Sequence, residues 1–218
     1  MSKWQDEKRQ VLEAAQKMEA KGLVMGNSGN VSLRLPPENG RDIIAITPSR
    51  RYYDLIGIDD IQVIDFEAEP VEGDLPPSIE SMLHIGIYRA RPKINAVLHT
   101  HSVFASILAV AGLEVPPILE DQVIFIGGEI KLAAYAASGS DEMTQNVIAA
   151  LGERNAVLLP NHGAVGVGRD MRDAFTVCEL LEKTARVYVG ALALGKVNNL
   201  PEEAVEVGKA FFNLLQSG

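Results

Sequence analysis

The chain has 218 residues, of which 47% are hydrophobic and 22% charged, so it is long and apolar enough to fold around a sizeable core. At roughly 100–200 residues per domain, this length allows one large domain or two small ones. With 19 Gly, 11 Pro and a single Cys, the composition excludes the disordered, collagen-like and disulfide-rich classes. The sequence is that of an ordinary globular protein.

Charge and apolar patterning restrict the partners of the chain. It carries 29 acidic against 20 basic residues, a net charge of -9 that opposes binding to a nucleic-acid backbone, and its basic residues form no cluster. The longest apolar stretches, such as residues 103–113, are about half of the roughly 20 residues that cross a bilayer, and the first residues lack a signal core. Cys178 cannot form an internal disulfide and is expected to be a buried apolar residue. We therefore expect a cytoplasmic protein that binds neither nucleic acid nor membranes.

Helical periodicity opens the chain, and β-rich stretches follow it. Apolar side chains recur on one face over residues 3–22, with Ser2 and Gln5 as a capping box and Gly22 as the end of the helix. The next stretches are short, contain Val, Ile or Leu, and are bounded by turn residues, which is typical of neighbouring antiparallel strands. These strands are expected at residues 29–35, 43–47 and 61–66.

The rest of the chain alternates between helical and strand patterns. Ser78 and Ser102 are the expected N-caps of the next two helices. Helices are expected at residues 78–91, 102–111, 140–151, 171–194 and 201–215. Strands are expected at residues 96–101, 122–126, 156–160 and 164–168. Several strands between helices predict the α/β class, with a mixed, mainly antiparallel sheet covered by helices in one domain over residues 1–218.

The four histidines carry the most information about function. His99 and His101 lie two residues apart in an expected strand, so both imidazoles project from the same face at a spacing that one divalent metal ion can bridge. Hydrogen-bonded imidazoles without a metal are the alternative for such a pair. His162 stands in a tight polar turn and can supply a third imidazole, which would suit zinc or a similar metal with an open, catalytic fourth position. His84 lies inside a helix and is expected to be structural.

Glu80 is the best candidate for a carboxylate beside such a metal. It falls in the first turn of the helix that Pro77 and Ser78 open, near unpaired N–H groups and the positive end of the helix dipole. Abstraction of a proton beside a carbonyl group needs a base of this kind. A surface glutamate that only compensates the dipole is the alternative.

Three segments have the residues of a phosphate site. Residues 26–30, Gly-Asn-Ser-Gly-Asn, can form a concave nest of backbone N–H groups, although a plain turn remains the alternative. Residues 47–50 and 77–78 add hydroxyl groups, a guanidinium group and a helix N-terminus. The glycine spacing is not that of a nucleotide-binding loop. A phosphorylated ligand is therefore expected.

These segments, taken in order, resemble the class II aldolase/adducin family. The motifs are Gly-Asn-Ser-Gly-Asn-Val-Ser at 26–32, Ile-Thr-Pro-Ser at 46–49, Pro-Ser-Ile-Glu at 77–80, His-Thr-His at 99–101 and Asn-His-Gly at 161–163. Within the family, the L-fuculose-1-phosphate aldolase branch is the most similar. The likeness extends from about residue 6 to about residue 195, and the ordered motifs make a chance match improbable.

The resemblance implies a three-layer α/β/α sandwich, assembled as a homotetramer with active sites at subunit interfaces. It implies a zinc ion, or alternatively manganese, cobalt or another divalent metal. His99, His101 and His162 match the family's metal ligands, and Glu80 matches a carboxylate that both approaches the metal and acts as acid/base. The family's phosphate-holding positions are matched in this chain by Gly29, Asn30, Ser49, Arg50, Ser78 and Ile79.

The implied reaction cleaves a ketose 1-phosphate to dihydroxyacetone phosphate and a small aldehyde through a metal-stabilised enediolate. The sequence departs from the fuculose enzyme at three places. Ile79 replaces a second Ser, which leaves only its backbone N–H for the phosphate, and Arg50 replaces Gly and adds a charged donor. Asp121 aligns with the interface Tyr that protonates the aldehyde side, so Asp121 is expected to be the second catalytic group.

Three other functions occur on the same scaffold. Ribulose-5-phosphate 4-epimerases use an acidic residue in the region of Asp121, but they have Asp where this chain has Glu80. Methylthioribulose-1-phosphate dehydratases share the metal site. Adducin-like scaffold proteins lose the metal ligands, whereas this chain keeps three His and the Glu. The residues therefore favour an aldolase, with the epimerase and the dehydratase as alternatives.

Overall fold

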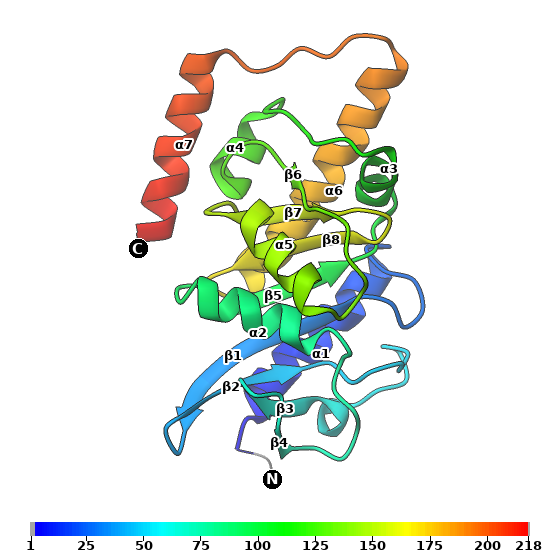
Figure 1. Ribbon diagram of the computed structural model, residues 1–218, viewed down its shortest axis with the longest axis vertical. Coiled ribbons are helices and arrows are strands. Elements are labelled where there is room, and N and C mark those ends of the chain that lie inside the picture. Colours follow the sequence, from blue (N-terminus) through cyan, green and yellow to red (C-terminus); the bar gives the residue numbers. More distant parts are fainter. Residues whose placement is uncertain (1–2, 218) are drawn as a thin grey trace.

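The computed structural model describes residues 3–217, which form one eight-stranded sheet with helices on both faces (Figure 1). The strand order is β4-β3-β2-β1-β5-β8-β7-β6. Only the β6–β7 pair is parallel among these strands, so the sheet is mixed and mainly antiparallel, as expected. The strands are β1 (Asn30–Glu38), β2 (Arg41–Ile46), β3 (Gln62–Asp65), β4 (Pro70–Glu72), β5 (Ala96–Thr100), β6 (Lys131–Leu132), β7 (Ala156–Leu159) and β8 (Gly163–Gly168).

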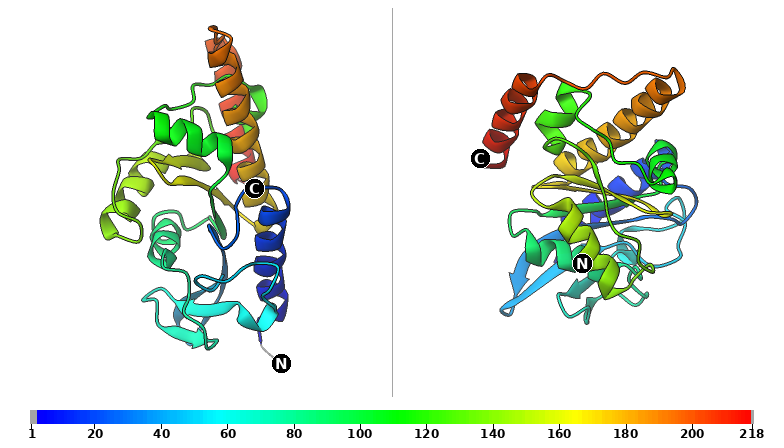
Figure 2. Two further views of the ribbon diagram at one scale, coloured as in Figure 1. Left: turned by 90° about the vertical axis from the view of Figure 1, so that its right-hand side faces the viewer. Right: turned by 45° about the horizontal axis from the view of Figure 1, so that its top comes forward.

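The helices make two layers around the sheet, which confirms the three-layer α/β/α architecture. Helices α1, α3 and α6 pack on one face, and α2 and α5 pack on the other, as the left view of Figure 2 shows for the longer helices. The helices are α1 (Gln5–Ala20), α2 (Ser81–Ala90), α3 (Val103–Ala111), α4 (Glu120–Ile126), α5 (Asp141–Leu151), α6 (Met171–Ala193) and α7 (Glu202–Ser217), and a short 3-10 helix spans Ile58–Asp60. No helix within residues 3–217 is long and apolar enough to cross a membrane.

Strand alternation explains why both faces of the sheet are covered. In β2, Ile43 and Ala45 pack against α1, whereas Ile44 and Ile46 point to the opposite face and pack with α2. Successive side chains of a strand project to opposite faces, so a run that is apolar at every position needs a layer on each side. Cys178 lies buried in α6 as expected, and burial raises the pKa of its thiol to about 12.

The prediction of a strand at residues 122–126 is wrong, because this segment is helix α4. The Gln122 side chain accepts hydrogen bonds from the backbone N–H groups of Ile118 and Leu119 at the helix start, and it donates to the carbonyls of Pro116 and Gly128. A short apolar run fits a buried helix and a strand equally well, and here the glutamine fixes the helix.

Other boundaries differ by a few residues or were not predicted. Helix α2 begins at Ser81 with Glu80 as its N-cap, three residues later than expected, and the Ser78 hydroxyl accepts from the Glu80 N–H instead. Ser102 occupies the N-cap of α3, but its side chain makes no capping hydrogen bond. The two short strands β4 and β6 were missed, and the cap expected at Ser2 lies outside the described residues.

Candidate active site

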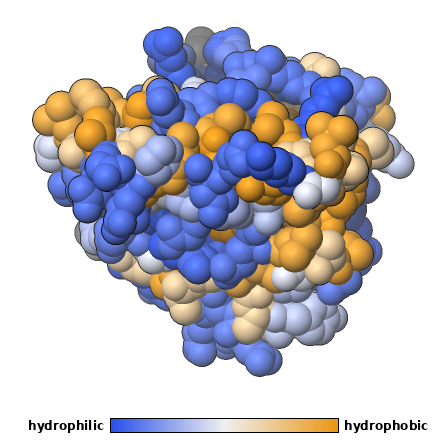
Figure 3. Space-filling view, turned by 90° about the horizontal axis from the view of Figure 1, so that it is seen from above, coloured by the Kyte–Doolittle hydropathy of each residue, from blue (hydrophilic) through white to orange (hydrophobic). Residues whose placement is uncertain are grey.

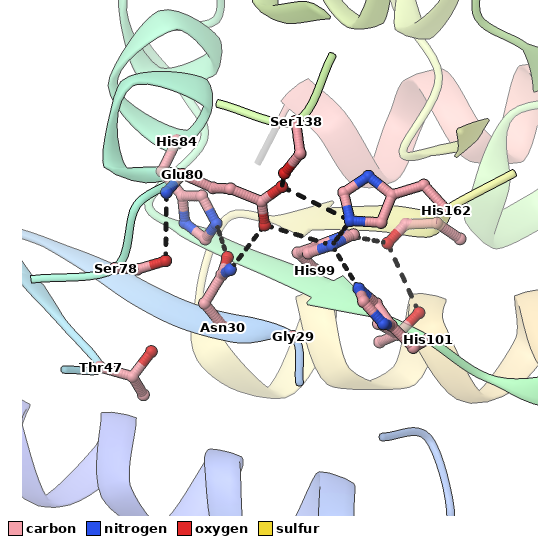
Figure 4. A network of polar contacts seen from close by, with 12 residues as sticks. Gly29, Asn30, Thr47, Ser78, Glu80, His84, His99, His101, Ser138 and His162 are labelled. Atoms are coloured by element: carbon pink, nitrogen blue, oxygen red, sulfur yellow. Dashed lines mark hydrogen bonds and ion pairs between the residues drawn. The ribbon is translucent and has the colours of Figure 1, made fainter. Parts of the chain in front are cut away.

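Three histidines converge at one end of β5 (Figure 4). His99 is the penultimate residue of β5, His101 follows the strand directly, and His162 lies in the turn between β7 and β8. The Nε2 atom of His99 lies 2.9 Å from that of His101 and 3.2 Å from that of His162. The antiparallel pairing of β5 with β8 brings the turn alongside the end of β5. The convergence expected from the sequence is therefore present.

The two residues that flank His162 determine the conformation of its turn. Asn161 adopts a left-handed backbone conformation with φ of 56°, which Asn tolerates better than most residues. A Cβ atom at Gly163 would overlap the Thr100 carbonyl oxygen, so only glycine allows the two strands to approach this closely. The Asn-His-Gly sequence therefore holds the imidazole against the end of β5.

A backbone hydrogen bond orients His99, and burial favours the neutral form of His101 and His162. The Nδ1 atom of His99 lies 3.0 Å from the Ala164 carbonyl oxygen, which accepts its proton and leaves Nε2 as the lone-pair atom. Burial, followed by repulsion from neighbouring imidazoles, lowers the pKa of His101 to about 3 and also lowers that of His162. The ligand atoms of the three residues all lie within 4.8 Å of one another. Three imidazoles this close suit a divalent transition metal, so the donor set fits the implied cofactor.

Glu80 faces the three imidazoles from the N-terminus of α2 and is buried, with 4% of its surface exposed. Its Oε2 atom lies 3.3 Å from His99 Nε2, and its Oε1 atom lies 3.5 Å from His162 Nε2. Asn30 Nδ2 donates to Oε2 at 2.9 Å, and the Ser138 hydroxyl donates to Oε1 at 2.7 Å. Each oxygen is therefore held by one neutral donor and points toward one imidazole.

Opposing effects set the charge of Glu80. Burial acts to raise the pKa of its carboxyl group, but His99 and the hydrogen bonds from Asn30 and Ser138 outweigh burial and lower the pKa to about 2. The group is therefore an ionised carboxylate near neutral pH, ready to accept a proton or to approach a cation.

A pocket of about 210 Å³ opens beside Glu80. It is lined by all six residues expected to hold a phosphate, which are Gly29, Asn30, Ser49, Arg50, Ser78 and Ile79. Glu80, His101 and His162 line it as well, whereas His99 lies fully buried behind them. The carboxylate, two imidazoles and the phosphate segments thus share one cavity.

Two backbone hydrogen bonds join the phosphate segments to each other. The Ser49 N–H donates to the Pro76 carbonyl at 2.9 Å, and the Ser78 N–H donates to the Thr47 carbonyl at 3.1 Å. Arg50 follows with a left-handed φ of 56°, a conformation that costs a non-glycine residue about 1 kcal/mol or more. This strained residue lines the pocket, so its guanidinium group is available to a ligand.

Gly29 is fixed by steric contact with a metal-ligand candidate. Its φ is 69°, and a Cβ atom there would lie 2.5 Å from the His99 carbonyl oxygen. Gly29→Ala is expected to lower the free energy of unfolding by about 3 kcal/mol, the sum of left-handed strain and overpacking. Gly22→Ala is the matched control, because Gly22 has the same conformation, φ 68°, with no atom near its Cβ position. Denaturant unfolding of both variants measures the difference, and equal losses would contradict the steric argument.

Sequence reasoning missed two parts of the site. Ser138 lies in the loop before α5, and no motif pointed to its bond with Glu80. The Asn30 side chain, expected to contact phosphate, is bonded to Glu80 and His84. The sequence feature that could have indicated this network is the polar His84 among mainly apolar residues of α2.

Asp121 does not lie at this site within the described chain. It is a half-buried residue of α4, and its carboxylate forms an ion pair with Lys183 of α6. It does not line the pocket that contains Glu80.

Comparisons with known proteins agree with the fold and show the family of the chain. The family described as class II aldolase and adducin N-terminal domain matches residues 9–189. A 5-deoxy-D-ribulose 1-phosphate aldolase of Bacillus thuringiensis is 33% identical, covering 93% of each chain. A 5-methylthioribulose-1-phosphate/5-deoxyribulose-1-phosphate aldolase of Rhodospirillum rubrum is 32% identical, covering 90% of this chain and 86% of the relative. A solved L-fuculose 1-phosphate aldolase superposes with a TM-score of 0.89 at 30% identity, covering 98% of each chain. The chain belongs to the class II aldolase and adducin family.

Proposed function

We propose that this protein is a metal-dependent aldolase that cleaves a ketose 1-phosphate to dihydroxyacetone phosphate and a small aldehyde. The observation that carries the proposal is the shared pocket, where an ionised Glu80, His101 and His162 lie next to segments suited to phosphate, with the buried His99 completing the imidazole cluster. An aldolase needs this combination, because one anionic end of the substrate is held while a base and an electrophile act on its carbonyl end.

His99, His101 and His162 would hold the metal ion, with Glu80 approaching it as a further ligand. Zinc fits the three-imidazole set best, and manganese and cobalt are the alternatives. The bound ion supplies Lewis-acid polarisation of the substrate's carbonyl group. Glu80 carries the proton that is exchanged at the carbon next to this carbonyl, and Asn30 and Ser138 hold its two oxygens in place meanwhile.

The phosphate would bind at the other end of the pocket, on the backbone N–H groups and hydroxyls of the joined segments. Arg50 supplies the charged donor in this arrangement. Arg50→Gly is expected to raise KM about tenfold with a smaller change in kcat, since a charged hydrogen bond is lost but the backbone strain is relieved. Arg51→Ala is the control, because Arg51 is an exposed neighbour that does not line the pocket. Steady-state kinetics test this, and equal KM values for the two variants would remove Arg50 from the phosphate site.

We propose a homotetramer with active sites at subunit interfaces. Exposed apolar side chains support self-association, and Figure 3 shows such side chains between polar ones at the end of the molecule near α6 and α7. Along α6, α7 and the segment between them, the exposed apolar residues include Leu192, Leu194, Val207, Phe211 and Leu214. In such an assembly, Asp121 of one subunit would reach the site of another and protonate the aldehyde side. We also propose that residues 1–218 form a single domain and that the protein is cytoplasmic.

The role of Asp121 is tested by a matched pair of variants. Asp121→Asn removes the carboxylate charge and is expected to lower kcat about 10²-fold, as for a lost proton donor. Lys183→Gln breaks the same ion pair but leaves the carboxylate in place, so its kcat is expected to stay within about threefold. Steady-state kinetics of the two variants decide the matter, and equal losses would make the ion pair, rather than Asp121 itself, the important feature.

The experiment for the function itself measures release of dihydroxyacetone phosphate in a coupled assay. The substrates are 5-deoxyribulose 1-phosphate, 5-methylthioribulose 1-phosphate and fuculose 1-phosphate, the ketose phosphates in the names of the similar proteins. We expect release from at least one of them by metal-loaded protein. Epimerisation of ribulose 5-phosphate, or dehydration of the methylthio sugar without release of the triose phosphate, would replace the aldolase proposal by one of its alternatives.

A further inference from the structure

A chain of buried hydrogen bonds runs from Glu80 away from the pocket. Asn30 donates to Glu80 through Nδ2, and its Oδ1 atom lies 2.5 Å from His84 Nε2. His84 Nδ1 lies 2.6 Å from the Ser32 hydroxyl, which lies 2.7 Å from the Tyr88 hydroxyl. His84 and Ser32 are both fully buried, so water does not replace any of these partners.

The direction of each hydrogen bond follows from the carboxylate. A carboxylate only accepts, so the Asn30 amide must turn its NH₂ group toward Glu80 and its carbonyl oxygen toward His84. The His84 Nε2 atom must then carry a proton to donate to this carbonyl. The ring is fully buried and its two nitrogens contact only the uncharged Asn30 amide and Ser32 hydroxyl, which favours the neutral form, so Nδ1 accepts from Ser32. Because Ser32 gives its proton to His84, its oxygen accepts from the Tyr88 hydroxyl at 2.7 Å, a shorter contact than the 3.4 Å from this hydroxyl to the Asn95 carbonyl.

We propose that His84 is a positioning residue for Glu80, acting as a neutral imidazole whose Nε2–H fixes the orientation of the Asn30 amide. The reverse orientation of Asn30 would place its carbonyl oxygen against the carboxylate, which is repulsive and would push Glu80 away from the imidazoles. His84 does not line the pocket, and its ring reaches the Glu80 side chain only through Asn30. Its backbone N–H also donates to the Glu80 carbonyl at 3.4 Å, a contact that a side-chain substitution leaves in place. The catalytic part of this inference rests on the aldolase reaction proposed above.

Two amide substitutions separate positioning from simple packing. His84→Gln places an N–H donor near the former Nε2 position and keeps the bond to Asn30. His84→Asn places its amide near the former Nδ1 position, so it keeps only the contact with Ser32. Both remove the ring and both bury one amide, which makes each the control of the other. Thermal unfolding and metal content report whether the two variants are equally folded and loaded.

We expect His84→Asn to lower kcat about 10²-fold and His84→Gln less than about tenfold, with KM changed less than about threefold in both. Equal kcat values for the two variants, high or low, would overturn the proposal. If neither variant folds, the ring tautomer of the wild-type protein decides instead. NMR of isotope-labelled histidine is expected to show His84 in the neutral Nε2–H form from about pH 6 to about pH 8, and the Nδ1–H form would overturn the proposal.

These measurements also distinguish the failure of this inference from the failure of the proposed function. The tautomer is measured without any substrate, so it tests the hydrogen-bond chain independently of the reaction that the protein catalyses. A wild-type protein with the expected tautomer that releases no dihydroxyacetone phosphate would refute the aldolase proposal while leaving the Asn30 orientation intact.

Discussion

Glu80→Gln is expected to lower kcat for ketose 1-phosphate cleavage by about 10²- to 10⁴-fold, because the amide cannot accept and return a proton. The substitution keeps the size of the side chain. The amide oxygen of the glutamine can still accept one of the two hydrogen bonds that Asn30 and Ser138 donate to Glu80. The three imidazoles are untouched, so the variant is expected to bind metal within about tenfold of the wild-type affinity. Steady-state kinetics and elemental analysis measure the two effects separately.

The control for this variant is Glu153→Gln. Glu153 is an exposed glutamate whose side chain is 93% accessible, so the same chemical change there is expected to leave kcat unaltered. A Glu80→Gln protein that is folded, metal-loaded and as active as the wild type would show that another group moves the proton.

His101→Ala is expected to abolish turnover and to leave little metal on the protein after dialysis. The substitution removes one of three converging imidazoles, and two imidazoles beside a carboxylate bind a divalent ion more weakly, by at least about 10²-fold. His101 is half-buried beside the pocket, so the fold is expected to survive the truncation. Elemental analysis of the dialysed protein measures the metal directly.

Ser102→Ala provides the comparison for His101→Ala. Its hydroxyl is buried with no hydrogen-bond partner among the described residues, so its removal breaks no bond next to the metal site. This variant is expected to keep about one metal ion per chain. A His101→Ala protein that retains as much metal as Ser102→Ala would mean that His101 is not a ligand.

The metal site was predictable because its geometry depends on local sequence rules. Residues two apart in an extended segment share a face, and His101 still lies beside His99 although β5 ends at Thr100. The left-handed Asn161 and the close contact at Gly163 explain why an Asn-His-Gly turn can carry the third imidazole. The order of the motifs carried the family resemblance, and the resemblance assigned the three histidines and Glu80 to one site.

The parts that could not be predicted depend on contacts between distant segments. Ser138 reaches Glu80 across 58 positions, and a single serine in a loop carries no signal of such a contact. The Asn30 side chain faces Glu80 and His84, which only the pairing of β1 with β5 and the packing of α2 determine. Helix α4 resembles a strand in sequence because its apolar run is too short for its periodicity to distinguish the two.

Exchange of solvent deuterium into dihydroxyacetone phosphate tests the central claim most directly, since it requires no knowledge of the aldehyde. Metal-loaded wild-type protein is expected to exchange one hydrogen at the hydroxymethyl carbon, and Glu80→Gln or removal of the metal is expected to stop the exchange. An absence of exchange with the metal-loaded wild-type protein would contradict the assignment of Glu80 and the imidazoles to an aldolase site.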